Sequence, residues 1–142
     1  MKIYNVIHIH NICDCGNCDI KSIGYFSTYE RACAIIDRRK SVSGFSAYPN
    51  EFIVTECNLE TMENLRTIYV LWIAVHDEQY SCDFEQTISI HSNHHEGMIA
   101  KENFMKMNAN CILKSKFVTE INLSEETIDF ENSWLYGFDA DE

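Results

Sequence analysis

The stretch VTECNLE at residues 54–60 returns as VTEINLS at residues 118–124. Five of the seven positions are identical, and the two stretches lie 64 residues apart in a chain of 142 residues. Two hydrophobic runs repeat in the same way, because Ile3-Tyr4 begins the first and Ile68-Tyr69 begins the second. We interpret this pattern as a tandem duplication of roughly 60 residues, with too few copies for a solenoid. It favours a pseudo-twofold pair of units folded into one body.

Each copy predicts the order strand, strand, helix, strand. The strands are expected at residues 3–10, 20–26 and 52–59 in the first copy, and at 68–76, 84–91 and 117–123 in the second. Residues 71–75 are all apolar, so this strand has two apolar faces, which is typical of a central strand.

The helices are expected to begin near two serines, Ser27 and Ser92. Ser27-Thr28-Tyr29-Glu30 matches a capping box, in which the side chain of Ser27 accepts from the backbone. The apolar stripe that follows consists of Tyr29, Ala32, Cys33 and Ile36. The second helix is expected over residues 93–107, with a stripe of Gly97, Ala100, Phe104 and Met107.

The fold class that follows is α+β, with two tandem β-β-α-β units, about six strands and two main helices. The units are expected at residues 1–65 and 66–142, the second carrying an acidic and aromatic C-terminal segment, within one compact domain. The pattern leaves open whether the strands form one sheet or two.

Residues 40–59 carry a Gly44-Phe45 pair, then Tyr48-Pro49, then Phe52 before the last strand of the first copy. With Ile23-Gly24-Tyr25-Phe26-Ser27 before them, they resemble a small bacterial and phage domain family of unknown function. Trp134 and Gly137-Phe138 are similar to the ending of some members. The second copy lacks the Gly-Phe and Tyr-Pro signature and is read as a diverged copy. The resemblance implies a fold and brings no catalytic residues.

Charge is distributed unevenly along the chain. Residues 1–65 carry six Lys/Arg and eight Asp/Glu, whereas residues 66–142 carry five and fourteen, and the net charge of the chain is −11. Proteins that bind nucleic acid neutralise phosphates with Lys and Arg, so this balance argues against direct DNA or RNA binding. A basic protein partner is the natural expectation.

The chain has seven cysteines, and neither a secretory leader nor a long apolar segment is recognised in it. An odd number of cysteines cannot pair fully within one chain, which favours reduced thiols and a cytoplasmic protein.

One cluster has ligand types that zinc prefers. The candidate metal ligands are His10, Cys13, Cys15 and Cys18, and Cys15-Gly16-Asn17-Cys18 has the spacing of a metal-binding knuckle. The alternative is a polar hairpin loop with reduced cysteines, because residues 76–83 of the second copy hold only one His and one Cys. No other cofactor is expected.

No catalytic constellation stands out. The stretch Ser92-Asn93-His94-His95-Glu96 lacks the spacing of a metalloprotease helix and reads as a helix start at Asn93. A nucleophile elbow and a phosphate-binding glycine loop are also missing from the sequence. The chain is therefore predicted not to be an enzyme.

The C-terminal segment alternates acids with bulky apolar residues, as expected of a surface that faces a basic partner. The candidate partner-binding residues are Glu120, Glu125, Glu126, Asp129, Glu131, Trp134, Tyr136 and Phe138. The alternative is a segment that packs its aromatic residues on its own sheet.

Two functions remain open at this stage. The first is a non-enzymatic stoichiometric inhibitor of a basic protein, of the immunity or phage anti-defence type. The alternative is a metal- or small-ligand-binding module that uses the Cys/His cluster of residues 8–18 or a pocket between the repeats.

Overall fold

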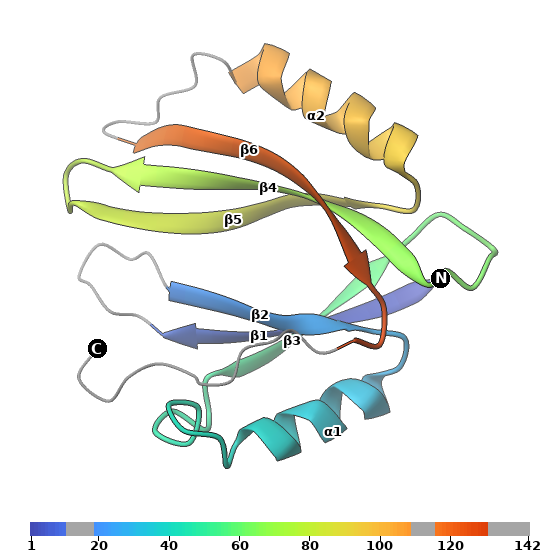
Figure 1. The fold of residues 1–142 in the computed structure, drawn as a ribbon, viewed down its shortest axis with the longest axis vertical. Coiled ribbons are helices and arrows are strands. Elements are labelled where there is room, and N and C mark those ends of the chain that lie inside the picture. Colours follow the sequence, from blue (N-terminus) through green and yellow to red (C-terminus); the bar gives the residue numbers. More distant parts are fainter. Residues whose placement is uncertain (11–18, 109–115, 131–142) are drawn as a thin grey trace. The chain divides into compact units, whose positions relative to one another are not determined.

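The computed structural model describes residues 1–10, 19–108 and 116–130 (Figure 1). The expected α+β architecture is confirmed, with six strands in two three-stranded antiparallel sheets and one helix in each half. The elements of the first half are β1 (Lys2–His10), β2 (Asp19–Phe26), α1 (Tyr29–Arg39) and β3 (Phe52–Asn58). Those of the second half are β4 (Thr67–Asp77), β5 (Cys82–His91), α2 (His94–Asn108) and β6 (Lys116–Thr127).

The two sheets have the same strand order. It is β2-β1-β3 in the first and β5-β4-β6 in the second, so the first strand of each copy is central. The apolar run of residues 71–75 therefore lies in a central strand, as its two apolar faces predict. The question of one sheet or two is answered by two separate three-stranded sheets.

Helix α1 packs on one face of the first sheet. The hydrophobic cluster between them consists of Val6, Ile23, Phe26, Ala32, Ile35 and Phe45. Two of these residues, Ala32 and Ile35, are the buried residues of α1. The predicted stripe was wrong at Tyr29, which is 54% exposed, because the buried face of the helix is centred nearer Ile35.

The predicted start of α1 is wrong by one residue. Thr28, and not Ser27, is the N-cap, because the Thr28 hydroxyl accepts a hydrogen bond from the Arg31 amide at 3.1 Å. Ser27 lies one residue before the cap and has a different partner, described below. The expected start of the second helix at Asn93 is confirmed, since the Asn93 side chain accepts a hydrogen bond from the Glu96 amide at 2.9 Å.

The burial of α2 also differs from its predicted stripe. Gly97 is buried, and a Cβ atom at this position would lie 2.9 Å from Leu123 of β6. Met107, placed in the stripe by its spacing, is instead 81% exposed. Gly97, in the first turn of the helix, thus allows α2 to approach Leu123 of β6 closely.

The two copies repeat local details at a distance of 65 residues. The strand register shifts between Val6 and Ile7 in β1, and between Leu71 and Trp72 in β4. The two helix caps, Thr28 and Asn93, are separated by the same distance. β-Bulges and caps are specific local features, so this agreement supports the interpretation of a duplicated unit.

An aromatic contact repeats with the same spacing. The rings of Tyr4 and Tyr29 meet edge to face at 5.9 Å, and those of Tyr69 and His94 do so at 5.4 Å. In both copies this contact joins the central strand to the first turn of the helix.

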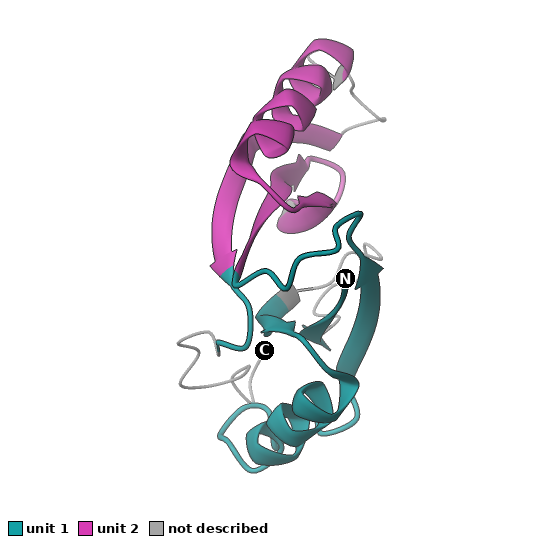
Figure 2. Ribbon diagram, turned by 90° about the vertical axis from the view of Figure 1, so that its right-hand side faces the viewer, with its two compact units in different colours: residues 1–12, 18–66, 127–142 teal, residues 13–17, 67–126 magenta. Residues whose placement is uncertain are grey.

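The chain forms two compact units (Figure 2). The described residues of the first unit are 1–10, 19–66 and 127–130, and those of the second are 67–108 and 116–126. The chain therefore returns to the first unit after Glu126. No helix in the described part of the chain is long and apolar enough to span a membrane.

Candidate functional site

Three of the predicted partner-binding acids lie on β6. This strand is at the edge of the second sheet, next to β4. Glu120 and Glu125 are exposed, and Glu126 is half-buried. Because side chains alternate along a strand, Glu120 and Glu126 belong to one face and Glu125 to the other.

Side-chain contacts of β6 agree with this alternation. Ser124 accepts a hydrogen bond from the Trp72 indole at 2.8 Å, whereas Leu123 lies against Gly97 of α2. Glu126 therefore shares the face of Ser124. Burial raises the pKa of the Glu126 carboxyl above its ordinary value, because partial desolvation disfavours the charged form.

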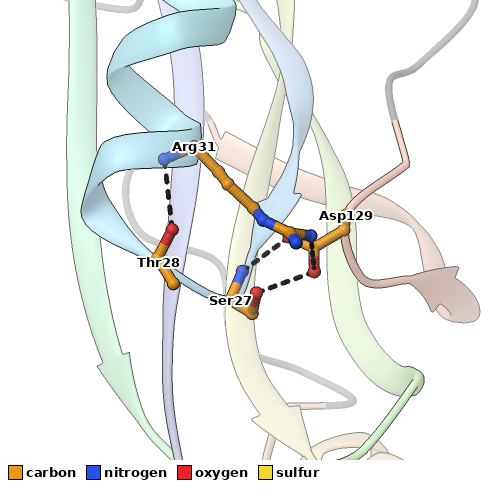
Figure 3. A network of polar contacts seen from close by, with 4 residues as sticks. All are labelled: Ser27, Thr28, Arg31 and Asp129. Carbon is orange, nitrogen blue, oxygen red and sulfur yellow. Dashed lines mark hydrogen bonds and ion pairs between the residues drawn. The ribbon is translucent and has the colours of Figure 1, made fainter.

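The fourth described acid, Asp129, belongs to the first unit and has several partners there (Figure 3). Its Oδ1 accepts from the Ser27 amide at 2.8 Å, and its Oδ2 accepts from the Ser27 hydroxyl at 2.7 Å. The Arg31 guanidinium lies 2.7 Å from Oδ2. Asp129 thus supplies a negative charge at the N-terminus of α1, where the helix dipole favours one.

The backbone holds Asp129 in this position. Ile128 forms an isolated parallel bridge with Tyr25 of β2, and the Asp129 amide donates to the Tyr25 carbonyl at 2.7 Å. The Ile128 amide donates to the Arg66 carbonyl at 2.7 Å. Asp129 has φ 63°, a left-handed conformation in which Asp is tolerated better than most residues. We call residues Ile128 to Phe130 the return segment.

The return segment also explains one glycine of the sequence. A Cβ atom on Gly24 would lie 2.7 Å from the carbonyl oxygen of Phe130. Only a glycine allows the backbone of the return segment to approach β2 this closely.

Apart from His10, the remaining predicted site residues lie outside the described part of the chain. They are Glu131, Trp134, Tyr136 and Phe138, together with the candidate metal ligands Cys13, Cys15 and Cys18. His10 is the last residue of β1, and its backbone pairs with Asp19. Within the described ranges, no group of three or more His, Cys, Asp or Glu side chains could hold a metal ion.

The Gly-Phe and Tyr-Pro loop packs around a buried histidine. His8 of β1 is fully buried, and its Nε2 lies 2.9 Å from the carbonyl oxygen of Tyr48. Its ring contacts those of Phe45 and Phe52 at 4.8 and 4.6 Å. The corresponding residue of β4, 65 positions later, is Ile73. The signature loop and the histidine are therefore features of the first copy only.

A serine and a histidine meet on β5. Ser89 Oγ lies 2.6 Å from His91 Nε2, and both side chains are half-buried. Sequence reasoning missed this pair, although a spacing of two residues on a strand places both side chains on one face. The hydrogen bond satisfies both polar groups at the edge of the sheet.

Comparison of the chain with known protein families gives a match in the first unit. The family model of a domain of unknown function (DUF7336) matches residues 1–68. These residues include β1 to β3 and the Gly-Phe and Tyr-Pro loop. The resemblance to a domain of unknown function is thus confirmed for this part of the chain, and the family membership of the second copy stays a prediction. No curated protein and no solved structure matches the chain.

Proposed function

We propose that the chain is a non-enzymatic acidic binding protein, a stoichiometric inhibitor of a basic protein partner of the immunity or phage anti-defence type. The charge of the second unit supports this proposal. Its described residues include nine Asp/Glu and three Lys/Arg, whereas those of the first unit include eight and seven. A surface of one sign attracts a partner of the other sign and accelerates their encounter.

Some acids of both units have close partners, and in the second unit Asp83 Oδ1 lies 2.7 Å from His76 Nδ1. In the first unit, Glu56 pairs with Lys2 at 2.9 Å and Asp129 pairs with Arg31. In the described part of the chain, neither Glu120 nor Glu125 makes an ion pair. Their carboxylates are thus accessible to cations of a partner.

Acids on an edge strand have a second explanation. Charged side chains at the edge of a sheet prevent other strands from pairing with it. Glu85 on β5, the opposite edge of the same sheet, is exposed in the same way. Edge protection requires no partner, so association kinetics distinguish it from the proposed role.

The first experiment is native mass spectrometry of the protein captured gently from its own host or from infected cells. A basic protein bound at fixed stoichiometry supports the proposal and identifies the target. A partner-free protein that carries a metal ion or a small molecule contradicts it and favours a ligand-binding module.

Once the target is identified, Glu120→Gln combined with Glu125→Gln tests whether the acids of β6 accelerate association with it. We expect slower association with the target, with a larger effect at low ionic strength than at high, because exposed charges are screened by salt. Glu60→Gln combined with Glu63→Gln is the matched control, since it removes two exposed charges from the first unit. Equal association rates for the two double variants at low salt would refute the role of β6.

A further inference from the structure

Helix α2 exposes more apolar surface than its counterpart in the first copy. Met98, Ile99 and Met105 are 36, 45 and 47% exposed, and Met107 is 81% exposed. In α1, all of whose residues are described, Tyr29 is the one large apolar residue exposed to this degree. The fold therefore does not require this surface.

The residues at corresponding positions in the first copy make the contrast specific. Cys33, Ala34 and Lys40 stand 65 residues before Met98, Ile99 and Met105. Large apolar side chains thus replace a small or charged residue at each of these positions. An apolar surface that the fold does not need indicates an interaction site.

Two of the exposed methionines, Met98 and Met105, belong to one face of α2, whereas Met107 lies on the opposite side of the helix. Met98, Lys101, Glu102 and Met105 have the spacing i, i+3, i+4 and i+7, which places them on the same side of a helix. Methionine side chains are flexible and adapt to an apolar surface opposite them. We call these four residues the α2 face.

The charge of α2 indicates what would cover this face. The helix carries two lysines, Lys101 and Lys106, and two acids, Glu96 and Glu102. The other described residues of the second unit contain one Lys and seven acids. In a chain of net charge −11, a neutral helix is where two copies meet with the least repulsion. A basic partner would instead encounter two lysines there.

We propose that a second copy of this chain docks on the α2 face, with the two helices antiparallel about a twofold axis. With the axis between Lys101 and Glu102, the Met98 side chain of one copy lies opposite Met105 of the other. Lys101 then lies opposite Glu102 of the second copy. The face is complementary to itself in both apolar and charged residues, as a twofold interface requires.

The small size of the interface indicates a weak association. A helix of 15 residues is about 22 Å long. One helix buries less than the roughly 800 Å² per partner of a stable complex. We therefore expect a weak dimer, with a Kd on the order of tens of micromolar. This proposal does not depend on the inhibitor role.

The test is sedimentation equilibrium of the full chain from about 1 µM to about 1 mM, which spans the expected Kd. We expect the mass to rise from monomer to dimer. Met105→Lys, which introduces the residue found at the corresponding position 40, should weaken the dimer at least about tenfold. Met62→Lys is the matched control, because Met62 is fully exposed in the first unit and should leave the dimer unchanged.

A charge exchange tests the orientation without altering the apolar residues. Lys101→Glu should weaken the dimer, because it places acids opposite each other. Lys101→Glu combined with Glu102→Lys should restore it, because the exchanged charges again face opposite charges. Circular dichroism checks that each variant keeps its helices. A monomer at every concentration, an assembly larger than a dimer, or a dimer insensitive to both Met105→Lys and Lys101→Glu would overturn the proposal.

Discussion

Asp129 is expected to stabilise the first unit although it lies 102 residues after its partner Ser27. Its carboxylate accepts from the Ser27 amide and hydroxyl and pairs with Arg31. The amide contact resembles an N-cap, whose loss costs about 0.5–2 kcal/mol. The Arg31 side chain is 61% exposed, so the ion pair contributes at most about 1 kcal/mol.

Three substitutions at Asp129 separate these contributions. Asp129→Asn keeps an acceptor and removes the charge, so we expect a loss of about 0.5–1 kcal/mol. Asp129→Gly removes every side-chain contact but tolerates the positive φ, and should lose about 1–2 kcal/mol. Asp129→Ala also strains the left-handed backbone by about 1 kcal/mol, which makes it the least stable of the three.

The free energy of unfolding is measured by urea denaturation with far-UV circular dichroism. Hydrogen exchange of the Ser27 amide localises the effect. Asp37→Asn is the control, because Asp37 is an exposed acid of the same helix far from its N-terminus. Salt at about 1 M should reduce the loss in Asp129→Asn, since screening weakens the lost ion pair. Stability of the Asp129→Ala variant equal to that of the wild type would refute the reasoning.

Four further predictions concern the packing and charge of the two units. Gly24→Ala should destabilise the protein by about 1–3 kcal/mol, because the new Cβ meets the Phe130 carbonyl oxygen at 2.7 Å. Gly97→Ala should leave the free energy of unfolding nearly unchanged in the same urea assay. The Leu123 methyl groups opposite the new Cβ can rotate away, and alanine favours a helix over glycine by about 1 kcal/mol. His8→Ala should cost about 2–4 kcal/mol, because it leaves a cavity between two aromatic rings; an unchanged urea midpoint would contradict this. Glu126→Gln should raise stability at neutral pH, because a raised carboxyl pKa means that ionisation is less favourable in the folded state. This gain should disappear as the pH falls through the pKa of Glu126, and a gain that persists in acid would exclude desolvation as its cause.

The fold was predictable because its signals are local. Alternating and continuous apolar runs predicted all six strands, and the VTE repeat predicted that the second half copies the first. The capping residue was not predictable to the position, because Ser27 and Thr28 both have a hydroxyl that suits an N-cap. The structure assigns the cap to Thr28 since Ser27 is bonded to Asp129.

The contacts of the candidate site were harder to predict because they join distant parts of the chain. In the sequence, Asp129 is indistinguishable from the acids of β6. Its contact with Ser27, 102 residues away, cannot be inferred from the spacing of nearby residues. The histidine at residue 8 has the pattern of an ordinary strand residue. Only the comparison with Ile73 shows that a polar ring replaces an apolar side chain at this position.

The return segment has a consequence for the order of events during synthesis. Residues 1–66 emerge first from the ribosome, but the residue that binds the start of α1 follows more than sixty residues later. Until then the edge of β2 that the return segment covers stays open to other chains, and unpaired edges promote aggregation. Contacts of such long sequence separation also slow folding. The first unit to be translated is therefore the last to be completed.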